Sequence, residues 1–145
     1  LRLWRECKPQ QFLGAVVLFS LKQEAPASVG GGTFTEEEYM ALLSEFPTAQ
    51  ALIDVGHAQV NDWDFDSLIC GLGSRIAAFH LHDNDGESDQ HLPIGMSHID
   101  WPHLLALIQT YASKATLVLE YANGNFKTAE ALMRHIETVR KTLAF

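Results

Sequence analysis

Histidines and carboxylates gather in residues 80–100, which read HLHDNDGESDQHLPIGMSHID. The stretch holds His80, His82, His91, His98, Asp83, Asp85, Glu87, Asp89 and Asp100. It directly follows an apolar run at 76–79 that is typical of a buried strand. Imidazole and carboxylate groups at this density are what a divalent cation requires as ligands. The stretch therefore predicts a metal site at the end of a strand.

Spacing within the stretch separates two possible sets of ligands. His80 and His82 are two residues apart, so in an extended strand both side chains point to one face. One of them is predicted to ligate the metal, and the other to contact substrate or support a ligand. Asp89 and His91 repeat the alternation and form a second plausible chelate. The alternative for this pair is a solvated acidic loop.

Two further carboxylates end apolar runs elsewhere in the chain. Asp54 precedes Gly56 and His57, and Gly56 breaks the strand so that His57 can fold back over its end. An Asp at a strand end can instead cap a turn; with His57 nearby, a metal role is favoured. Glu120 is the one charge in LVLEY at 117–121. A carboxylate in a buried strand is costly unless it is ligated or hydrogen-bonded, which favours a functional role.

These residues need elements that bring them together. Apolar, strand-like runs occur at 15–21, 51–55, 76–82 and 117–121, and each is followed by a helical pattern. The helices are predicted to begin at Thr35, Asp64, Asp100 and Thr128, all of which are good N-caps. Four such units predict an α/β fold with a parallel sheet and outer helices. Parallel sheets place active sites at the C-terminal ends of their strands, where the polar residues fall.

Bulk composition narrows the function classes. The 145 residues are predicted to form a single domain, 1–145, with a formal net charge of −8. That charge repels phosphate backbones and makes a nucleic-acid partner unlikely. Cys7 and Cys70 lack a CxxC spacing and suit reduced thiols in a cytoplasmic protein. No run approaches the ~18 apolar residues of a membrane span, and the absence of an initiating Met suggests a piece of something longer.

Three ordered motifs resemble one superfamily. They are DVGHA at 54–58, HLHDNDGESDQHLPIG at 80–95 with IDW at 99–101, and LVLE at 117–120. Together they are similar to the sugar phosphate isomerase/epimerase superfamily, which shares the xylose isomerase-like (β/α)8 TIM barrel with the apurinic-site endonucleases. The resemblance implies that the four units are the C-terminal half of that barrel. A complete barrel typically takes ~250 residues, so the N-terminal half would be missing.

The resemblance also assigns ligands. It implies that Asp54, His80 and Glu120 bind one divalent ion. It matches His57, Asp89 and His91 to positions that hold an additional zinc in the endonuclease branch. One departure is that Lys22 stands where the family carries a Glu ligand. Glu24, two residues on and facing the same way, is the alternative.

The leading hypothesis is a metal-dependent isomerase or epimerase that acts on a small sugar or sugar phosphate through a metal-stabilised enediolate. Glu120 would be both ligand and proton-transfer group, while His57 and His82 would orient substrate oxygens. Zinc or manganese is favoured as the ion, with magnesium and cobalt open. One alternative is a metal-dependent phosphodiesterase on abasic DNA. The other is an inactive fragment that pairs with the missing half-barrel or self-associates through its open sheet edges.

Overall fold

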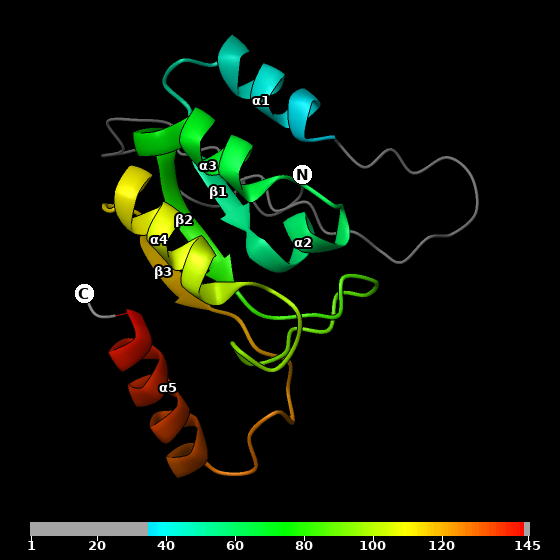
Figure 1. Ribbon diagram of the computed structural model, residues 1–145, viewed down its shortest axis with the longest axis vertical. Helices are drawn as coiled ribbons and strands as arrows, with labels where there is room; N and C mark the ends of the chain where they lie inside the picture. The colour runs from blue at the N-terminus through cyan, green and yellow to red at the C-terminus, as the bar shows by residue number, and fades with distance from the viewer. Residues whose placement is uncertain (1–34, 144–145) are drawn as a thin grey trace, which may run out of the picture.

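The computed structural model describes residues 35–143, and Figure 1 shows how their elements are arranged. The predicted strand at 15–21, and with it Lys22 and Glu24, lies outside the described residues. The elements are α1 (Glu36–Glu45), β1 (Ala51–Asp54), α2 (Val55–Val60), α3 (Phe65–Leu72), a 3-10 turn (Gly73–Arg75), β2 (Ile76–Leu81), α4 (Trp101–Tyr111), β3 (Thr116–Leu119) and α5 (Ala129–Leu143).

The three described strands form one parallel sheet in the order β1-β2-β3. Asp54 at the end of β1 pairs with His80, and His80 pairs with Val118 of β3. The backbone N–H of Glu120 donates to the carbonyl of Leu81 at 3.1 Å, so the ladder continues just past β3. The C-terminal ends of all three strands therefore lie at one edge. The predicted parallel α/β fold is confirmed; of the first predicted strand–helix unit, the helix is α1, and its strand at 15–21 lies outside the described residues.

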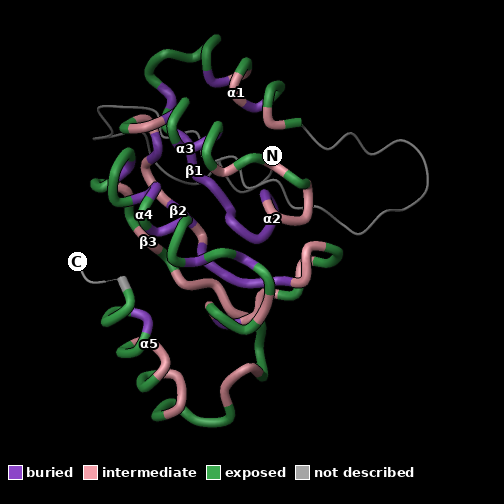
Figure 2. Tube along the Cα trace, viewed as in Figure 1, coloured by how far each residue is buried: buried purple, intermediate pink, exposed green. Residues whose placement is uncertain are grey.

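Burial separates the two faces of the sheet. Phe79 and Leu81 are fully buried in a core that they share with Leu68 of α3 and Ile108 of α4. Figure 1 shows α3 and α4 lying over this face, and Figure 2 shows purple buried positions along β1 and in parts of β2, α3 and α4. Because side chains alternate along a strand, His80 projects to the opposite face. That face is where the candidate ligands lie.

The prediction of a buried strand at 117–121 is wrong in one respect. β3 ends at Leu119, and its residues alternate between exposed and half-buried. Val118 is 40% exposed. The reason is that β3 is the edge strand of the described sheet. Apolar residues in an edge strand keep their β-propensity without gaining full burial on both faces.

Capping explains where most helices begin. Thr35 and Glu38 form a reciprocal capping box at α1, as the sequence predicted. Asp64 caps α3 and Asp100 caps α4, each by a side-chain oxygen that accepts a backbone N–H. The short helix α2 was not predicted, because Gly56 suggested only a break. Asp54 starts α2 by accepting the backbone N–H of His57 at 3.0 Å.

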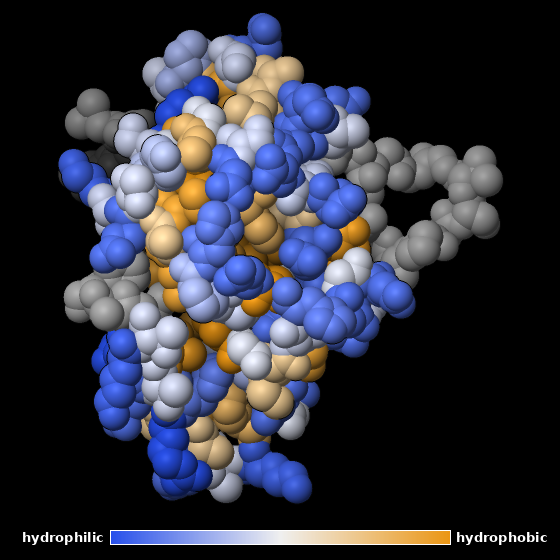
Figure 3. Space-filling model, viewed as in Figure 1, coloured by the Kyte–Doolittle hydropathy of each residue, from blue (hydrophilic) through white to orange (hydrophobic). Residues whose placement is uncertain are grey.

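The remaining surface is mixed. Exposed large apolar side chains are scattered over several elements, namely Phe46, Met96, Tyr111, Val118 and Met133. Figure 3 shows apolar residues interspersed with polar ones on the face that it displays. Such a distribution is ordinary for a protein surface. Across residues 35–143, no helix has both the length and the apolar character that a bilayer crossing would need.

Candidate metal centre

Asp54 lies at the centre of the site, where β1 turns into α2. Its Oδ1 accepts from the backbone N–H of His57 at 3.0 Å and from Nε2 of His82 at 2.8 Å. Its Oδ2 lies 3.6 Å from Nδ1 of His57 and 3.6 Å from Nδ1 of His80. Because two donors already engage Oδ1, Oδ2 is the oxygen that remains available to a cation.

The electrostatics keep Asp54 ionised. Its burial would raise the pKa of the carboxyl, but the hydrogen bonds from His82 and the His57 backbone, together with the charges of these histidines, outweigh burial and lower the pKa. An ionised carboxylate with one free oxygen is a ready ligand for a divalent cation.

The first donor group consists of Asp54, His80 and Glu120, whose ligand atoms all lie within 4.8 Å of one another. Nδ1 of His80 lies 2.7 Å from Oε2 of Glu120. That nitrogen nevertheless makes no hydrogen bond to any described residue. The strand register brings the three residues together, because Asp54 pairs with His80 and Glu120 directly follows β3. Donors from three neighbouring strand ends thus face one point.

Glu120 is more exposed than the sequence suggested. Its side chain is 44% exposed, against 5% for Asp54. Burial therefore does not require Glu120 to be ligated, since the residue follows the edge strand of the described sheet. What marks it as a candidate is its position beside His80 and Asp54. Its exposure also makes it the member of the group that a small molecule could reach.

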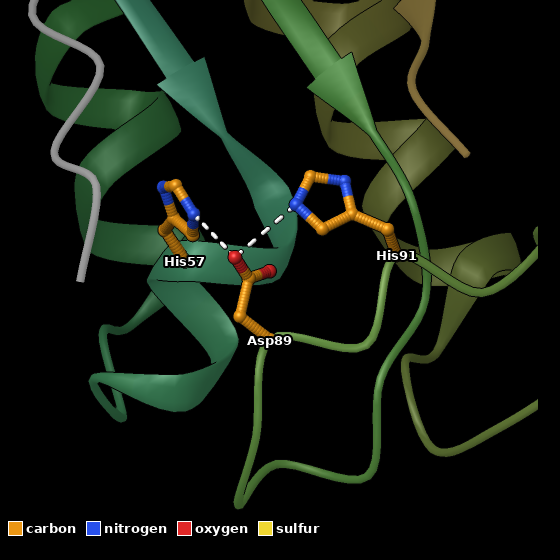
Figure 4. A group of neighbouring side chains, drawn as sticks. All are labelled: His57, Asp89 and His91. Atoms are coloured by element: carbon orange, nitrogen blue, oxygen red, sulfur yellow. Dashed lines mark hydrogen bonds and ion pairs between the residues drawn. The ribbon is translucent and has the colours of Figure 1, made fainter. Parts of the chain in front are cut away.

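The second donor group consists of His57, Asp89 and His91. Figure 4 shows the two imidazoles pointing at the Asp89 carboxylate from either side. Oδ2 of Asp89 lies 3.0 Å from Nε2 of His57 and 3.1 Å from Nε2 of His91. His57 comes from α2, whereas the other two come from the loop between β2 and α4. Asp89 and His91 are half-buried, and His57, which Asp89 contacts, is buried. The alternative of a solvated acidic loop therefore fits this pair poorly.

Unpaired buried atoms support the fit of a cation to these residues. Within the described chain, the atoms without a hydrogen-bond partner include His57 Nδ1, His80 Nδ1, His82 Nδ1 and Asp89 Oδ1. Unpaired polar atoms at buried positions are costly and rare. Three of these four atoms belong to residues of the two donor groups, and their imidazole and carboxylate chemistry suits zinc or manganese.

Asp83 organises the loop that carries the second group, although no specific role was predicted for it. The residue is fully buried. Its carboxylate accepts hydrogen bonds from the backbone N–H groups of Asn84, Gly95, Ser97 and Ile99 and from Nε1 of Trp101. Its backbone also pairs with Leu92 in an isolated antiparallel bridge. The available signal was an Asp directly after a buried strand, followed by a turn and a Trp.

His82 contacts the candidate ligands but is not one of them. It is fully buried and belongs to neither donor group. Burial would lower its pKa, but the hydrogen bond to Asp54 and the charges of Asp54, Asp89 and Glu120 outweigh burial and raise the pKa. Of the two roles that the sequence left open for the second strand histidine, full burial disfavours contact with substrate oxygens and favours support of a ligand.

The other histidines lie apart from the two groups. His98 is exposed, and His103 pairs at 2.8 Å with Asp66 on the surface. His135 lies on α5. It is half-buried, and its Nε2 lies 2.9 Å from the hydroxyl of Tyr121, because α5 packs this side chain against the loop after β3.

The fold and the donor groups define a class. Residues 24–142 match the xylose isomerase-like TIM barrel family, and the chain belongs to that family. The resemblance drawn from the three motifs is thereby confirmed.

Among solved structures, a D-tagatose 3-epimerase-like protein is similar with a TM-score of 0.61 at 22% identity, over 76% of this chain and 41% of its own. The D-allulose 3-epimerase of Methylomonas sp. has a TM-score of 0.57 at 15% identity, over 74% and 43%. A D-psicose 3-epimerase solved in the presence of D-fructose has a TM-score of 0.54 at 13% identity, over 77% and 42%. At these low identities, the TM-scores show a shared fold alone.

A curated relative is an uncharacterised protein of Methanocaldococcus jannaschii, 30% identical over 95 residues that make up 63% of this chain and 32% of the relative. The chain thus spans about a third of this relative and roughly two fifths of the solved structures.

Proposed function

We propose that the complete protein is a divalent-metal-dependent isomerase or epimerase of a small sugar or sugar phosphate. The observation that carries the proposal is the convergence of Asp54, His80 and Glu120 within 4.8 Å at the C-terminal ends of three parallel strands. The three similar solved structures carry the names of sugar 3-epimerases, or of a protein like one, which supports the substrate class.

The exposure and the hydrogen bonds of the site residues indicate a different role for each of them. A divalent cation bound by the first donor group would act as a Lewis acid on a carbonyl oxygen and its neighbouring hydroxyl. Asp54, which is buried and doubly hydrogen-bonded, serves as a fixed anchor. Glu120, with an accessible side chain, is suited to move a proton at the carbon beside that carbonyl. His57 presents Nδ1 toward Asp54 and Nε2 toward Asp89, so its ring can orient a substrate oxygen or join a second ion.

Solvent isotope exchange tests the proposal. The full-length protein is incubated in D2O with ketohexoses, ketopentoses and their phosphates, with Zn²⁺ or Mn²⁺ supplied. We expect deuterium to enter at the carbon beside the carbonyl. Glu120→Gln should abolish that exchange, while the matched exposed control Glu130→Gln should not. Absence of exchange and of product with every sugar would refute the proposed reaction.

A second candidate is a phosphodiesterase that cleaves abasic DNA. The specific observation in its favour is the second donor group. It lies beside the first, because Nδ1 of His57 is 3.6 Å from Oδ2 of Asp54. The net charge of −8 counts against a polyanionic substrate. Incubation of the same metal-loaded protein with a labelled abasic duplex separates the two candidates, because only the phosphodiesterase would produce a nick.

We further propose that the described sheet is one part of a barrel and needs a complement. β1 and β3 are the edge strands of the described sheet, and β3 exposes apolar Val118. Open edges of this kind favour pairing with another strand. The 145-residue chain should therefore self-associate or bind a separately expressed N-terminal half-barrel, and light scattering that shows a stable monomer would contradict this.

A further inference from the structure

His82 touches both donor groups without belonging to either. Its ring is fully buried, its Nε2 bonds Asp54 of the first group, and its face packs on His91 of the second. We infer that His82 is a positioning residue shared by the two groups, one that sets the orientation of a ligand in each through a different part of the same ring. The inference rests on the proposed metal site and goes beyond it by assigning a role to a residue that does not ligate.

The link to the first group is a hydrogen bond. The Nε2–H of His82 donates to Oδ1 of Asp54 at 2.8 Å. This bond and the N–H of the His57 backbone hold Oδ1, so Oδ2 is turned toward His80 and Glu120. Without the His82 donor, the carboxylate would keep a single restraint at Oδ1 and could rotate about its Cβ–Cγ bond. Supporting hydrogen bonds of this kind fix the orientation of metal ligands.

The main link to the second group is a stacked ring pair, beside a longer approach of Nε2 of His82 to Oδ1 of Asp89 at 3.9 Å. The centroids of His82 and His91 lie 3.9 Å apart, and their planes differ by 10°. His91 itself sits in a left-handed backbone conformation with φ of 50°, its carbonyl accepts hydrogen bonds from Ala122 and Asn125, and its Nδ1 lies 3.3 Å from the carbonyl oxygen of Glu120. The stack adds a restraint on the plane of the ring. The stack holds the imidazole so that Nε2 faces Asp89 at 3.1 Å. Loss of the aromatic face should therefore loosen His91 and leave Asp54 in place.

The space for this ring is provided by Gly56. A Cβ atom added at Gly56 would overlap the His82 ring, at Cε1 and at both ring nitrogens. Nδ1 of His82 has no hydrogen-bond partner, so the ring is held by Nε2, by the stack and by contact with Gly56. The ring is fully buried, so substrate oxygens do not reach it. That enclosure is why His82 is assigned a positioning role.

Two substitutions separate the links. His82→Gln keeps an amide N–H near the position of Nε2–H and removes the ring face. His82→Phe keeps the ring face and removes the donor. His103→Gln is the matched control, because His103 makes a comparable 2.8 Å contact with a carboxylate on the surface, away from both groups. Asp54→Asn and His91→Gln serve as references that disable the first and the second group.

The measurement is Zn²⁺ binding to each purified full-length variant, by competition with a chromogenic chelator, with thermal unfolding to verify the fold. Asp54→Asn should remove zinc binding at the first donor group. His82→Phe should weaken the zinc affinity of that same group by about 10- to 100-fold. His82→Gln should instead weaken the affinity that His91→Gln removes, and His103→Gln should change neither.

The outcomes are distinct. If the wild-type protein binds zinc and both His82 variants retain both affinities, the inference is wrong and the proposed metal site stands. If both variants weaken both affinities equally, His82 acts only through general stability and the inference is also wrong. If the wild-type protein binds no zinc, the proposed metal site fails and takes the inference with it.

Discussion

Asp83 is the best place to test whether a non-ligand residue holds the loop between β2 and α4. The substitution Asp83→Asn keeps the size of the side chain and replaces one carboxylate oxygen by an amide NH2 group. In the structure Oδ2 accepts from Gly95, Ser97 and Trp101, while Oδ1 accepts from Asn84 and Ile99. All five partners are donors, so the amide nitrogen of Asn has no acceptor to face in either orientation.

The expected magnitude follows from the better of the two orientations. Asn can keep its oxygen toward the three donors around Oδ2, and its amide NH2 group then faces the N–H groups of Asn84 and Ile99. Two hydrogen bonds to a charged acceptor are lost, at about 1.5–3 kcal/mol each. The free energy of unfolding should therefore fall by about 3–6 kcal/mol, a large part of the 5–15 kcal/mol typical of a domain. Zinc affinity of the group with Asp89 and His91 should fall as well, since the loop carries both.

The assay is urea unfolding followed by circular dichroism, with chelator competition on the folded protein. The matched control is Asp85→Asn, because Asp85 also accepts several hydrogen bonds in the same loop but does so in contact with solvent. Asp85→Asn should change the free energy of unfolding little, since water replaces the lost hydrogen-bond partners. Equal stability losses in the two variants would refute the reasoning that burial makes Asp83 critical.

Three further predictions concern the centre itself. Gly56→Ala should lower the melting temperature by crowding His82, although Ala is the better helix former; Gly71→Ala, which meets only the flexible end of a Met side chain, should be neutral or stabilising. A melting temperature for Gly56→Ala at or above that of the wild type would contradict the close contact. Because the pKa of Asp54 is lowered on folding, its contribution is present above the ordinary pKa of Asp and is lost as pH falls through the folded value. The metal-free wild type should thus lose more stability than Asp54→Asn below about pH 4, and parallel pH curves would argue against it. Chelation of the metal with EDTA should lower the melting temperature of the wild type and leave that of Asp54→Asn unchanged, as scanning fluorimetry can measure.

The parallel sheet and its polar edge could be predicted from the sequence. The apolar runs and the polar residues after them indicate a parallel sheet with a reactive edge, because side-chain direction alternates along a strand regardless of its neighbours. The same periodicity places His80 and His82 on one face. Capping residues such as Thr35 and Asp100 likewise mark helix starts, since a cap bonds groups only a few residues away.

Distances between strands required the tertiary structure. Local spacing cannot tell which histidine meets Asp54 Oδ2 and which supports Oδ1, because that depends on the register of β1 against β2. Nor can it tell that Glu120 is only partly buried, since its exposure depends on whether another strand covers β3. The sequence alone determined the kinds of donor and the edge at which they gather. Packing and register decided their partners, because these are set by residues far apart in the chain.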